Sequence, residues 1–261
     1  MKVKNHMIGA IAGDIIGSTR ERNRIKTIDF ELFPEGSRYT DDTILTVAIA
    51  DSILNNVDFE TNLRNYYKLY PAKGYGHGFK YWAMEDDLDD ISKKELEARG
   101  FEIGMSQANG SAMRVSPVGY AYDTLDRVLR KAKQTSELSH GHPEGIKGAQ
   151  ATAACTFLAR EGKTKEEIRE YIETKFKYDL HRTVDEIRLT CKFKTSCAKS
   201  VPESILCFLE SENFEHAIRL AISLGGDSDT MACISGELPR HIIMAFRKIS
   251  RIKCFNISMI A

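Results

Sequence analysis

Gly225-Gly226-Asp227-Ser228-Asp229-Thr230 stands directly before the apolar run Met231-Ala232-Cys233-Ile234, and Tyr39-Thr40-Asp41-Asp42-Thr43 stands directly before a second apolar segment of helical period. Each of these two acidic loops places two carboxylates and flanking hydroxyls at the start of an expected helix. Such residues cap helices, and acids favour the positive end of the helix dipole, so one loop alone is more often a cap than a metal site. A cap needs only one acceptor, however. We therefore predict that the two loops converge on a divalent cation.

The ligand types in the acidic loops narrow the choice of metal. Carboxylate and hydroxyl oxygens without histidine or cysteine suit Mg²⁺, Mn²⁺ or Ca²⁺ rather than zinc. Four carboxylates in one site repel each other strongly unless they are neutralised, so two bound ions are expected.

Away from these loops the pattern is helical. Apolar residues recur at helical spacing in residues 43–55, 62–69, 124–135, 145–160, 164–176, 202–209 and 214–224. Pro202 has the position of a first-turn proline. Alternating β-branched runs are scarce and no repeat is found, which favours a single compact all-α domain of many helices. Residues 71–78 and 103–117 are rich in glycine and polar residues, and we expect both to be functional loops.

Composition excludes several classes of protein. Among 261 residues, 37 Lys and Arg balance 37 Asp and Glu, so the chain lacks the basic field of a general nucleic-acid binder. The apolar segments are too short for a membrane helix, and Asp14 interrupts the one near the N-terminus, which argues against a signal peptide. The six cysteines are scattered without a Cys-x-x-Cys pair, as in reduced cytoplasmic proteins.

Five motifs, in order, resemble those of the ADP-ribosylglycohydrolase family, which includes dinitrogenase-reductase-activating glycohydrolases and ADP-ribosyl-acceptor hydrolases. They are the opening stretch 9–18, the first acidic loop at 40–43, Asn109-Gly110-Ser111-Ala112-Met113-Arg114, Ser139-His140-Gly141-His142-Pro143-Glu144-Gly145, and the second acidic loop at 226–230. Together they cover roughly residues 7–236. The resemblance implies an all-α fold with a binuclear Mg²⁺ or Mn²⁺ centre in a cleft.

The resemblance also implies roles for individual residues. Metal ligands are expected at Thr40, Asp41, Asp42, Asp227, Asp229 and Thr230, and catalytic roles at Glu21, Asp41, Asp42 and Asp229. Glu21 matches a mobile glutamate near the metals and is assigned acid/base and gating work, although the residues alone, in the run Arg20-Glu21-Arg22, favour a solvated charge. Asp14 is expected to orient the first acidic loop rather than to bind metal.

Substrate contacts are expected mainly from the two glycine-rich loops, whose backbones can approach a diphosphate closely. The residues concerned are Gly74, Tyr75, Gly76, Ser106, Asn109, Gly110, Ser111 and His142. His142 precedes a proline, and such a histidine is otherwise a helix-entry or core residue. Arg114 is expected either to pair with phosphate or to hold its loop through an internal salt bridge.

Two features depart from the family pattern. Many relatives carry an aromatic residue and a glycine before Asn109, where this chain has Gln107-Ala108, so an aromatic that would stack on adenosine is missing. Tyr75, Phe79 or Trp82 can compensate, although Phe79 and Trp82 also suit the core. The second departure is the stretch 237–261, which lacks the Ala/Tyr-rich helix of relatives. We hypothesise that a one-base deletion before Leu238 produced this tail, leaving residues 1–236 as the ADP-ribosylglycohydrolase-like domain.

The implied activity is cleavage of the C1″ glycosidic bond of an ADP-ribosylated protein or small-molecule acceptor, with release of ADP-ribose, by a cytoplasmic enzyme. Two alternatives stay open. One is a non-catalytic ADP-ribose-binding or crystallin-like structural member of the family. The other is a calcium-stabilised helical domain without a substrate. A nucleic-acid partner is disfavoured by the neutral charge; the residues give no oligomeric state.

Overall fold

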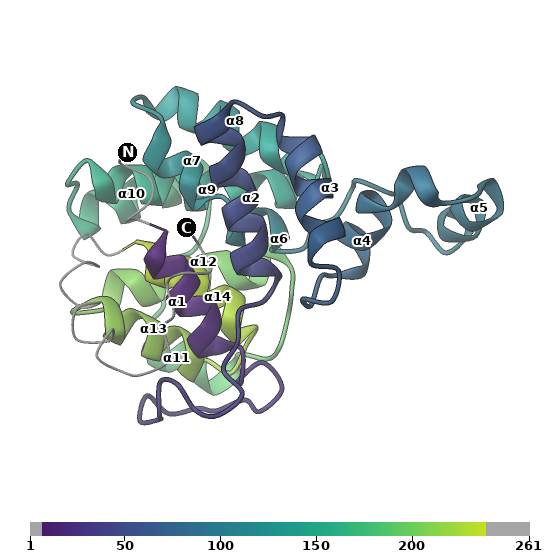
Figure 1. The fold of residues 1–261 in the computed structure, drawn as a ribbon. Helices are drawn as coiled ribbons and strands as arrows, with labels where there is room; N and C mark the ends of the chain where they lie inside the picture. Colours follow the sequence, from purple (N-terminus) through teal and green to yellow (C-terminus); the bar gives the residue numbers. More distant parts are fainter. Residues whose placement is uncertain (1–6, 239–261) are drawn as a thin grey trace.

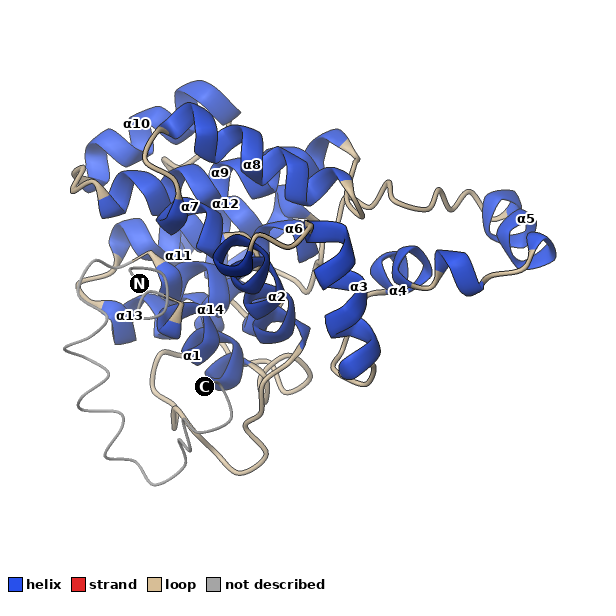
Figure 2. Ribbon diagram, turned by 45° about the horizontal axis from the view of Figure 1, so that its top comes forward, coloured by secondary structure: helices blue, strands red, loops and turns tan. Residues whose placement is uncertain are grey.

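The computed structural model describes residues 7–238, and helices dominate that part of the chain (Figure 1; Figure 2). The helices of the first half are α1 (Ile8–Gly17), α2 (Asp41–Asn55), α3 (Phe59–Leu69), α4 (His77–Ala83), the 3₁₀ turn η1 (Glu85–Asp87), α5 (Asp90–Ala98), α6 (Gly110–Met113) and α7 (Ser116–Ala121). Those of the second half are α8 (Leu125–Glu137), α9 (Pro143–Arg160), α10 (Lys165–Phe176), α11 (Val184–Thr190), α12 (Cys197–Glu210), α13 (Phe214–Ser223) and α14 (Ser228–Glu237).

This architecture confirms the prediction of an all-α fold. Within residues 7–238 the only β-type pairings are two isolated bridges, between Met105 and His140 and between Ala108 and Ser196. No helix in that part of the chain has the length and apolar character needed to cross a membrane. The tail predicted for residues 237–261 lies, from residue 239 onward, outside the described residues.

Two local predictions are wrong. Residues 103–117, expected to form a loop, contain α6 and the beginning of α7. Pro202 lies inside α12 and not in its first turn, because this helix begins at Cys197. Its early start coincides with a tertiary contact: the Cys197 amide donates to the Gln107 carbonyl at 3.0 Å, and a local sequence window cannot contain that bond.

The core centres on α9, which is buried along most of its length and packs against α6, α7, α8, α10 and α12. Its inner residues are largely alanine, glycine and threonine, so several helices can approach one axis closely. Aromatic and aliphatic side chains of the surrounding helices fill the remaining space, among them Leu63, Ile172 and Ile205. These residues form one large cluster, in which burial of apolar surface is the main stabilising term, and a small separate cluster contains Met7, Ile11 and Ala50.

Within residues 7–238, helices α1 and α14 make the most extensive helix–helix contact, although they come from opposite ends of this part of the chain (Figure 1). A Cβ atom at Gly13 would lie 2.1 Å from the Ala232 carbonyl oxygen, and one at Gly17 would lie 2.4 Å from that of Ser228. Only glycine permits this backbone approach. The contact sets the start of α14, and therefore the second acidic loop, beside α1.

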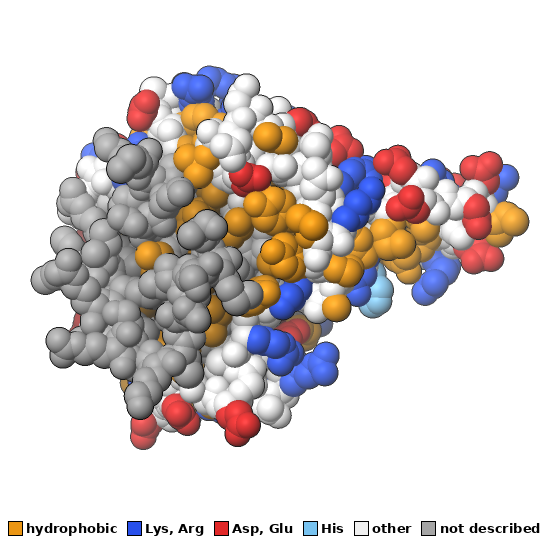
Figure 3. Space-filling view, viewed as in Figure 1, with side chains coloured by type: hydrophobic (Ala, Val, Ile, Leu, Met, Phe, Trp, Pro, Cys, Tyr) orange, Lys and Arg blue, Asp and Glu red, His pale blue; other side chains and the backbone are white. Residues whose placement is uncertain are grey.

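An arm formed by α4, η1 and α5 projects from the body, with acidic and basic side chains distributed over its surface (Figure 1; Figure 3). The base of the arm packs through Phe79 and Trp82, which are buried with Tyr75 and Tyr67 in one aromatic cluster. The loop 71–76, which precedes α4, is thereby held next to the first acidic loop: the Asp41 amide donates to the Lys73 carbonyl at 2.8 Å.

Replacement of Gly13 by alanine is expected to destabilise the protein by at least the 1–3 kcal/mol typical of overpacking, because the added methyl group meets the α14 backbone. Urea unfolding measures the change. Gly76→Ala is the control, since a Cβ there meets no atom within 4 Å and the backbone φ is −62°. Equal unfolding midpoints for the two variants would contradict this account of the α1–α14 contact.

Candidate metal and substrate site

Asp14, in α1, holds the first acidic loop in place. Its carboxylate accepts hydrogen bonds from the Thr40 amide at 2.9 Å, the Thr40 hydroxyl at 2.7 Å and the Thr43 amide at 3.1 Å, and also from the Thr43 hydroxyl. Asp14 is fully buried. Four donors on one carboxylate fix the entry into α2, as expected of a loop-orienting residue.

The two acidic loops meet in space although they are far apart in sequence. The Thr230 hydroxyl donates to Asp42 Oδ2 at 3.3 Å across a separation of 188 positions. Carboxylate oxygens of Asp14, Asp42 and Asp229 lie within 4.8 Å of one another. Asn109, from the segment 99–109 that joins α5 to α6 (the central loop), donates to Asp227 Oδ2 at 2.8 Å and so joins a third segment to the cluster.

Helix capping does not account for these acids. At α2 the cap is the Thr40 hydroxyl, which accepts from the Asp42 amide, so neither Asp41 nor Asp42 is required for it. At α14 the cap position is Asp227, whose side chain makes no capping hydrogen bond. The carboxylates at the start of α2 and of α14 are therefore not explained by helix capping.

The electrostatics of this cluster fit a divalent cation. Burial, followed by the neighbouring carboxylates, raises the pKa of Asp41, Asp42 and Asp229 well above the ordinary value. Asp42 Oδ1 is buried without a hydrogen-bond partner, and no Lys or Arg within residues 7–238 forms an ion pair with these acids. Buried carboxylates at this density are costly unless positive charge compensates them, and hard oxygen donors are those that Mg²⁺ and Mn²⁺ prefer.

The cluster lines a cleft of about 630 Å³. Most of the residues predicted from sequence line it: Glu21, Thr40, Asp41, Asp42, Gly74, Gly76, Ser106, Asn109, Gly110, Asp227, Asp229 and Thr230. Glu21 faces the cleft with its side chain half-buried, and its charge contributes to the raised pKa of Asp229.

Three predicted substrate-binding residues lie elsewhere. Tyr75 is buried, with its ring stacked on Phe79 at 5.5 Å. The Ser111 hydroxyl is directed away and donates to the Gly145 carbonyl at 2.8 Å. His142 caps α9, where its Nδ1 accepts from the Glu144 amide at 3.1 Å, which is the helix-entry role that its position before a proline also allowed.

Of the two histidines in the motif 139–145, His140 lines the cleft, although no site role was predicted for it from the sequence. It is buried, and its main chain forms a bridge with Met105 of the central loop. Arg22, Arg38 and Lys73 also line the cleft. The position of His142 before Pro143 is the local signal that favours a helix-entry role for it, but nothing local indicates that His140 is directed into the cleft.

Arg114 neither lines the cleft nor forms the expected internal salt bridge with an acid of the described residues. It is completely buried, and its Nη2 donates to the Thr135 carbonyl and to Ser139 Oγ, each at 2.9 Å. Its guanidinium lies 5.5 Å from the centre of the Phe79 ring. Burial lowers the pKa of Arg114 to about 9, so the side chain keeps its charge at neutral pH.

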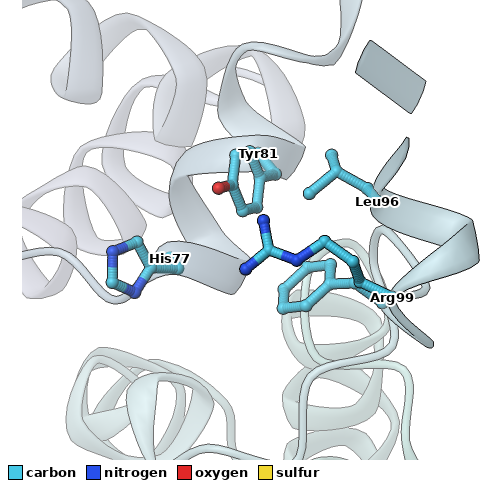
Figure 4. Close-up of a pocket in the computed structure, with 5 residues that line it drawn as sticks. His77, Tyr81, Leu96 and Arg99 are labelled. Atoms are coloured by element: carbon cyan, nitrogen blue, oxygen red, sulfur yellow. The ribbon is translucent and has the colours of Figure 1, made fainter. Parts of the chain in front are cut away.

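A second, smaller pocket of about 240 Å³ adjoins the cleft through His77, which lines both. Its other walls are Tyr81, Leu96, Arg99 and Phe101, and Figure 4 shows the Arg99 guanidinium directed between the rings of Tyr81 and His77. Tyr81 and Phe101 are in edge contact, with centroids 5.3 Å apart. Partly exposed aromatic rings thus lie here, whereas Tyr75 and Trp82 belong to the core, and Phe79, although buried, also lines the cleft.

Comparison with known proteins agrees with this geometry. The family model of ADP-ribosylglycohydrolase matches residues 1–238. The chain belongs to the ADP-ribosylglycohydrolase family. Its relatives include ADP-ribosylhydrolase ARH3 of Homo sapiens, 24% identical over 89% of this chain and 82% of the human protein. An uncharacterized protein of Archaeoglobus fulgidus is 27% identical over 91% and 86% of the two chains.

A solved structure described as an ADP-ribosylglycohydrolase-related protein complex has the same fold. It superposes with a TM-score of 0.64 at 22% identity, over 90% of this chain and 84% of the other. Both the family assignment and the all-α fold expected from the ordered motifs are therefore confirmed.

Saturating Mg²⁺ or Mn²⁺ is expected to stabilise the protein, by roughly 2.7 kcal/mol at a hundredfold excess over Kd, because the ion compensates buried carboxylates. In Asp229→Asn most of this gain is lost, while the variant without added metal is more stable than wild type because one buried charge is removed. Thermal unfolding with and without chelator measures both effects. Asp123→Asn, at an exposed position, is the control, and an equal metal response in the two variants would contradict the assignment.

Proposed function

We propose that this protein is a metal-dependent hydrolase that cleaves the C1″ glycosidic bond of an ADP-ribosylated acceptor and releases ADP-ribose. The observation that carries the proposal is the convergence of both acidic loops, with Glu21 and Asn109, in a single cleft. Family membership supports the same class of activity.

Thr40, Asp41, Asp42, Asp227, Asp229 and Thr230 would hold two Mg²⁺ or Mn²⁺ ions. Bound there, the ions supply charge to orient the hydroxyls of the distal ribose and to lower the pKa of a water molecule. Asp14 keeps the first loop in register, and Asn109 orients the Asp227 carboxylate through its hydrogen bond. Positioning of sugar and water by these residues lowers the entropic part of the barrier.

In the reaction the water oxygen bonds to C1″, the bond from C1″ to the acceptor breaks, and the acceptor atom leaves with a proton. Glu21 faces the cleft on the side of the acids and is the residue to which we assign proton transfer. The Gly74 and Gly110 backbones, together with the Ser106 hydroxyl, lie along the cleft for contact with the ribose and diphosphate.

The nucleotide end of the substrate is assigned to the aromatic pocket of His77, Tyr81 and Phe101. This pocket adjoins the cleft and offers ring faces to an adenine base, in place of the aromatic residue that many relatives carry at position 107. Arg99 can stack on the base or pair with a phosphate from the same wall (Figure 4).

Wild-type protein is expected to release ADP-ribose from at least one member of a panel of ADP-ribosylated acceptors in the presence of Mg²⁺ or Mn²⁺. Release is lost in Asp41→Asn and Asp229→Asn, and Glu21→Gln slows it by about a hundredfold or more through loss of proton transfer. Chromatographic detection of ADP-ribose measures each rate, and Asp123→Asn retains the wild-type rate. Binding of ADP-ribose without release from any acceptor would favour the non-catalytic alternative, and absence of binding would refute the substrate assignment.

Phe101→Ala is expected to weaken ADP-ribose binding by about 5- to 150-fold, the range that corresponds to roughly 1–3 kcal/mol for loss of one base–aromatic stack. Isothermal titration measures the change. Ribose 5-phosphate, which has no base, binds the variant as it binds wild type. Tyr70→Ala, which removes an exposed aromatic outside the pocket, is the control. Equal weakening for both ligands would place the base elsewhere.

A further inference from the structure

Three buried groups form a hydrogen-bonded chain behind the cleft wall. Ser139 Oγ lies 2.9 Å from Arg114 Nη2 and 2.9 Å from His140 Nδ1. A guanidinium can only donate, so Ser139 accepts from Arg114 and has its single hydroxyl hydrogen left to donate. Within the described residues, His140 Nδ1 is the only acceptor found for that hydrogen. Since Ser139 is fully buried, the arrangement that leaves no donor unsatisfied is the one in which its hydroxyl donates to Nδ1.

An imidazole that accepts at Nδ1 carries its proton at Nε2 when it is neutral. We propose that Arg114 and Ser139 are positioning residues, which hold His140 as the tautomer that presents its Nε2–H group to the cleft. The Nε2 atom lies at the cleft surface formed with Gly110, because a Cβ at Gly110 would come within 2.8 Å of it and both residues line the cleft. No hydrogen-bond partner for Nε2 is found among residues 7–238, so this donor is available to a ligand.

Two further observations favour the neutral ring. His140 is buried, and burial together with the nearby Arg114 charge lowers its pKa well below the ordinary value. The Arg114 guanidinium has no carboxylate partner in the described part of the chain, and its Nε and Nη1 atoms have no acceptor. The uncompensated positive charge of Arg114 disfavours a proton on the nearby Nδ1 atom of His140, so this charge also favours an unprotonated Nδ1.

This tautomer gives His140 and Glu21 different roles in the cleft, an assignment that rests on the function proposed above. His140 acts as a hydrogen-bond donor to an acceptor oxygen of the ADP-ribosyl group, such as a phosphate or hydroxyl oxygen, and does not accept a proton through Nε2. Gly110 is needed for this contact, because any side chain at that position would cover the Nε2–H group. Proton transfer is thereby left to Glu21.

Nitrogen NMR of the full-length protein labelled at histidine tests the tautomer directly, with His140→Gln used to assign the signals. Wild type is expected to show a protonated Nε2 and an unprotonated Nδ1 for His140 at neutral pH. Ser139→Ala removes the hydroxyl and is expected to give a mixture of tautomers, whereas Ser139→Thr retains the hydroxyl and restores the wild-type pattern. Ser136→Ala is the matched control, because the Ser136 hydroxyl is also buried and donates to the His140 carbonyl at 3.0 Å without touching the ring.

The kinetic expectation separates positioning from structural damage. If wild type releases ADP-ribose from one of the acceptors, Ser139→Ala is expected to raise KM for that substrate by about three- to tenfold, the effect of one misdirected hydrogen bond, and to leave kcat nearly unchanged. Ser136→Ala is expected to change neither KM nor kcat. ADP-ribose is the binding probe if no acceptor is turned over. In that case a wild-type Nε2–H signal that shifts on addition of ADP-ribose supports the positioning role even though hydrolysis has failed.

A wild-type spectrum with Nδ1 protonated overturns the inference whether or not the protein is a hydrolase, and it does so even if Ser139→Ala does not fold. Indistinguishable tautomer populations in Ser139→Ala and Ser136→Ala also overturn it. The predicted wild-type tautomer, its loss in Ser139→Ala and its recovery in Ser139→Thr support it.

Discussion

Asp14 and the glycines on either side of it bring the two acidic loops together. The carboxylate accepts two amide and two hydroxyl hydrogen bonds from the first acidic loop. One turn along the same helix, Gly17 allows the α1 backbone to touch the first residues of α14. A single ten-residue helix thus fixes both loops, one through polar contacts and the other through backbone packing. The cleft, its acids and its central loop all depend on this helix.

This arrangement buries a group of carboxylates, and because their ionised forms are poorly solvated, it destabilises the folded protein. Their raised pKa values have burial as the first cause and mutual repulsion as the next. A helical core with one large apolar cluster can tolerate that penalty, and a bound cation would remove most of it. The features that make the site unfavourable in isolation are those that would favour a hard, positively charged ligand, and binding of such a ligand would stabilise the fold through the same residues.

Particular residues show which features of the site can be predicted from the local sequence. The acidic loops could be predicted because two carboxylates and a hydroxyl at each of two helix starts exceed what capping requires, and the structure places them together. The residues that line the substrate-binding part of the cleft were harder to predict from the sequence. His142 and His140 are two residues apart in one turn, and only the packing of that turn against Met105 and Gly110 directs His140 into the cleft. Tyr75 and Ser111 were expected to contact substrate because of their neighbours, but aromatic packing and a bond to the Gly145 carbonyl direct them elsewhere.

The sequence by itself determined the helical class, the family and the identity of the acidic residues, since these follow from periodicity and from ordered motifs along the chain. Tertiary structure alone decided where α12 begins, which histidine faces the cleft, which aromatics stay accessible and that Arg114 is held by a carbonyl and a hydroxyl. The physical reason is the range of the interactions. Propensity and hydrophobic pattern act between near neighbours, whereas the direction of a side chain at a turn is set by contacts with segments that are remote in sequence.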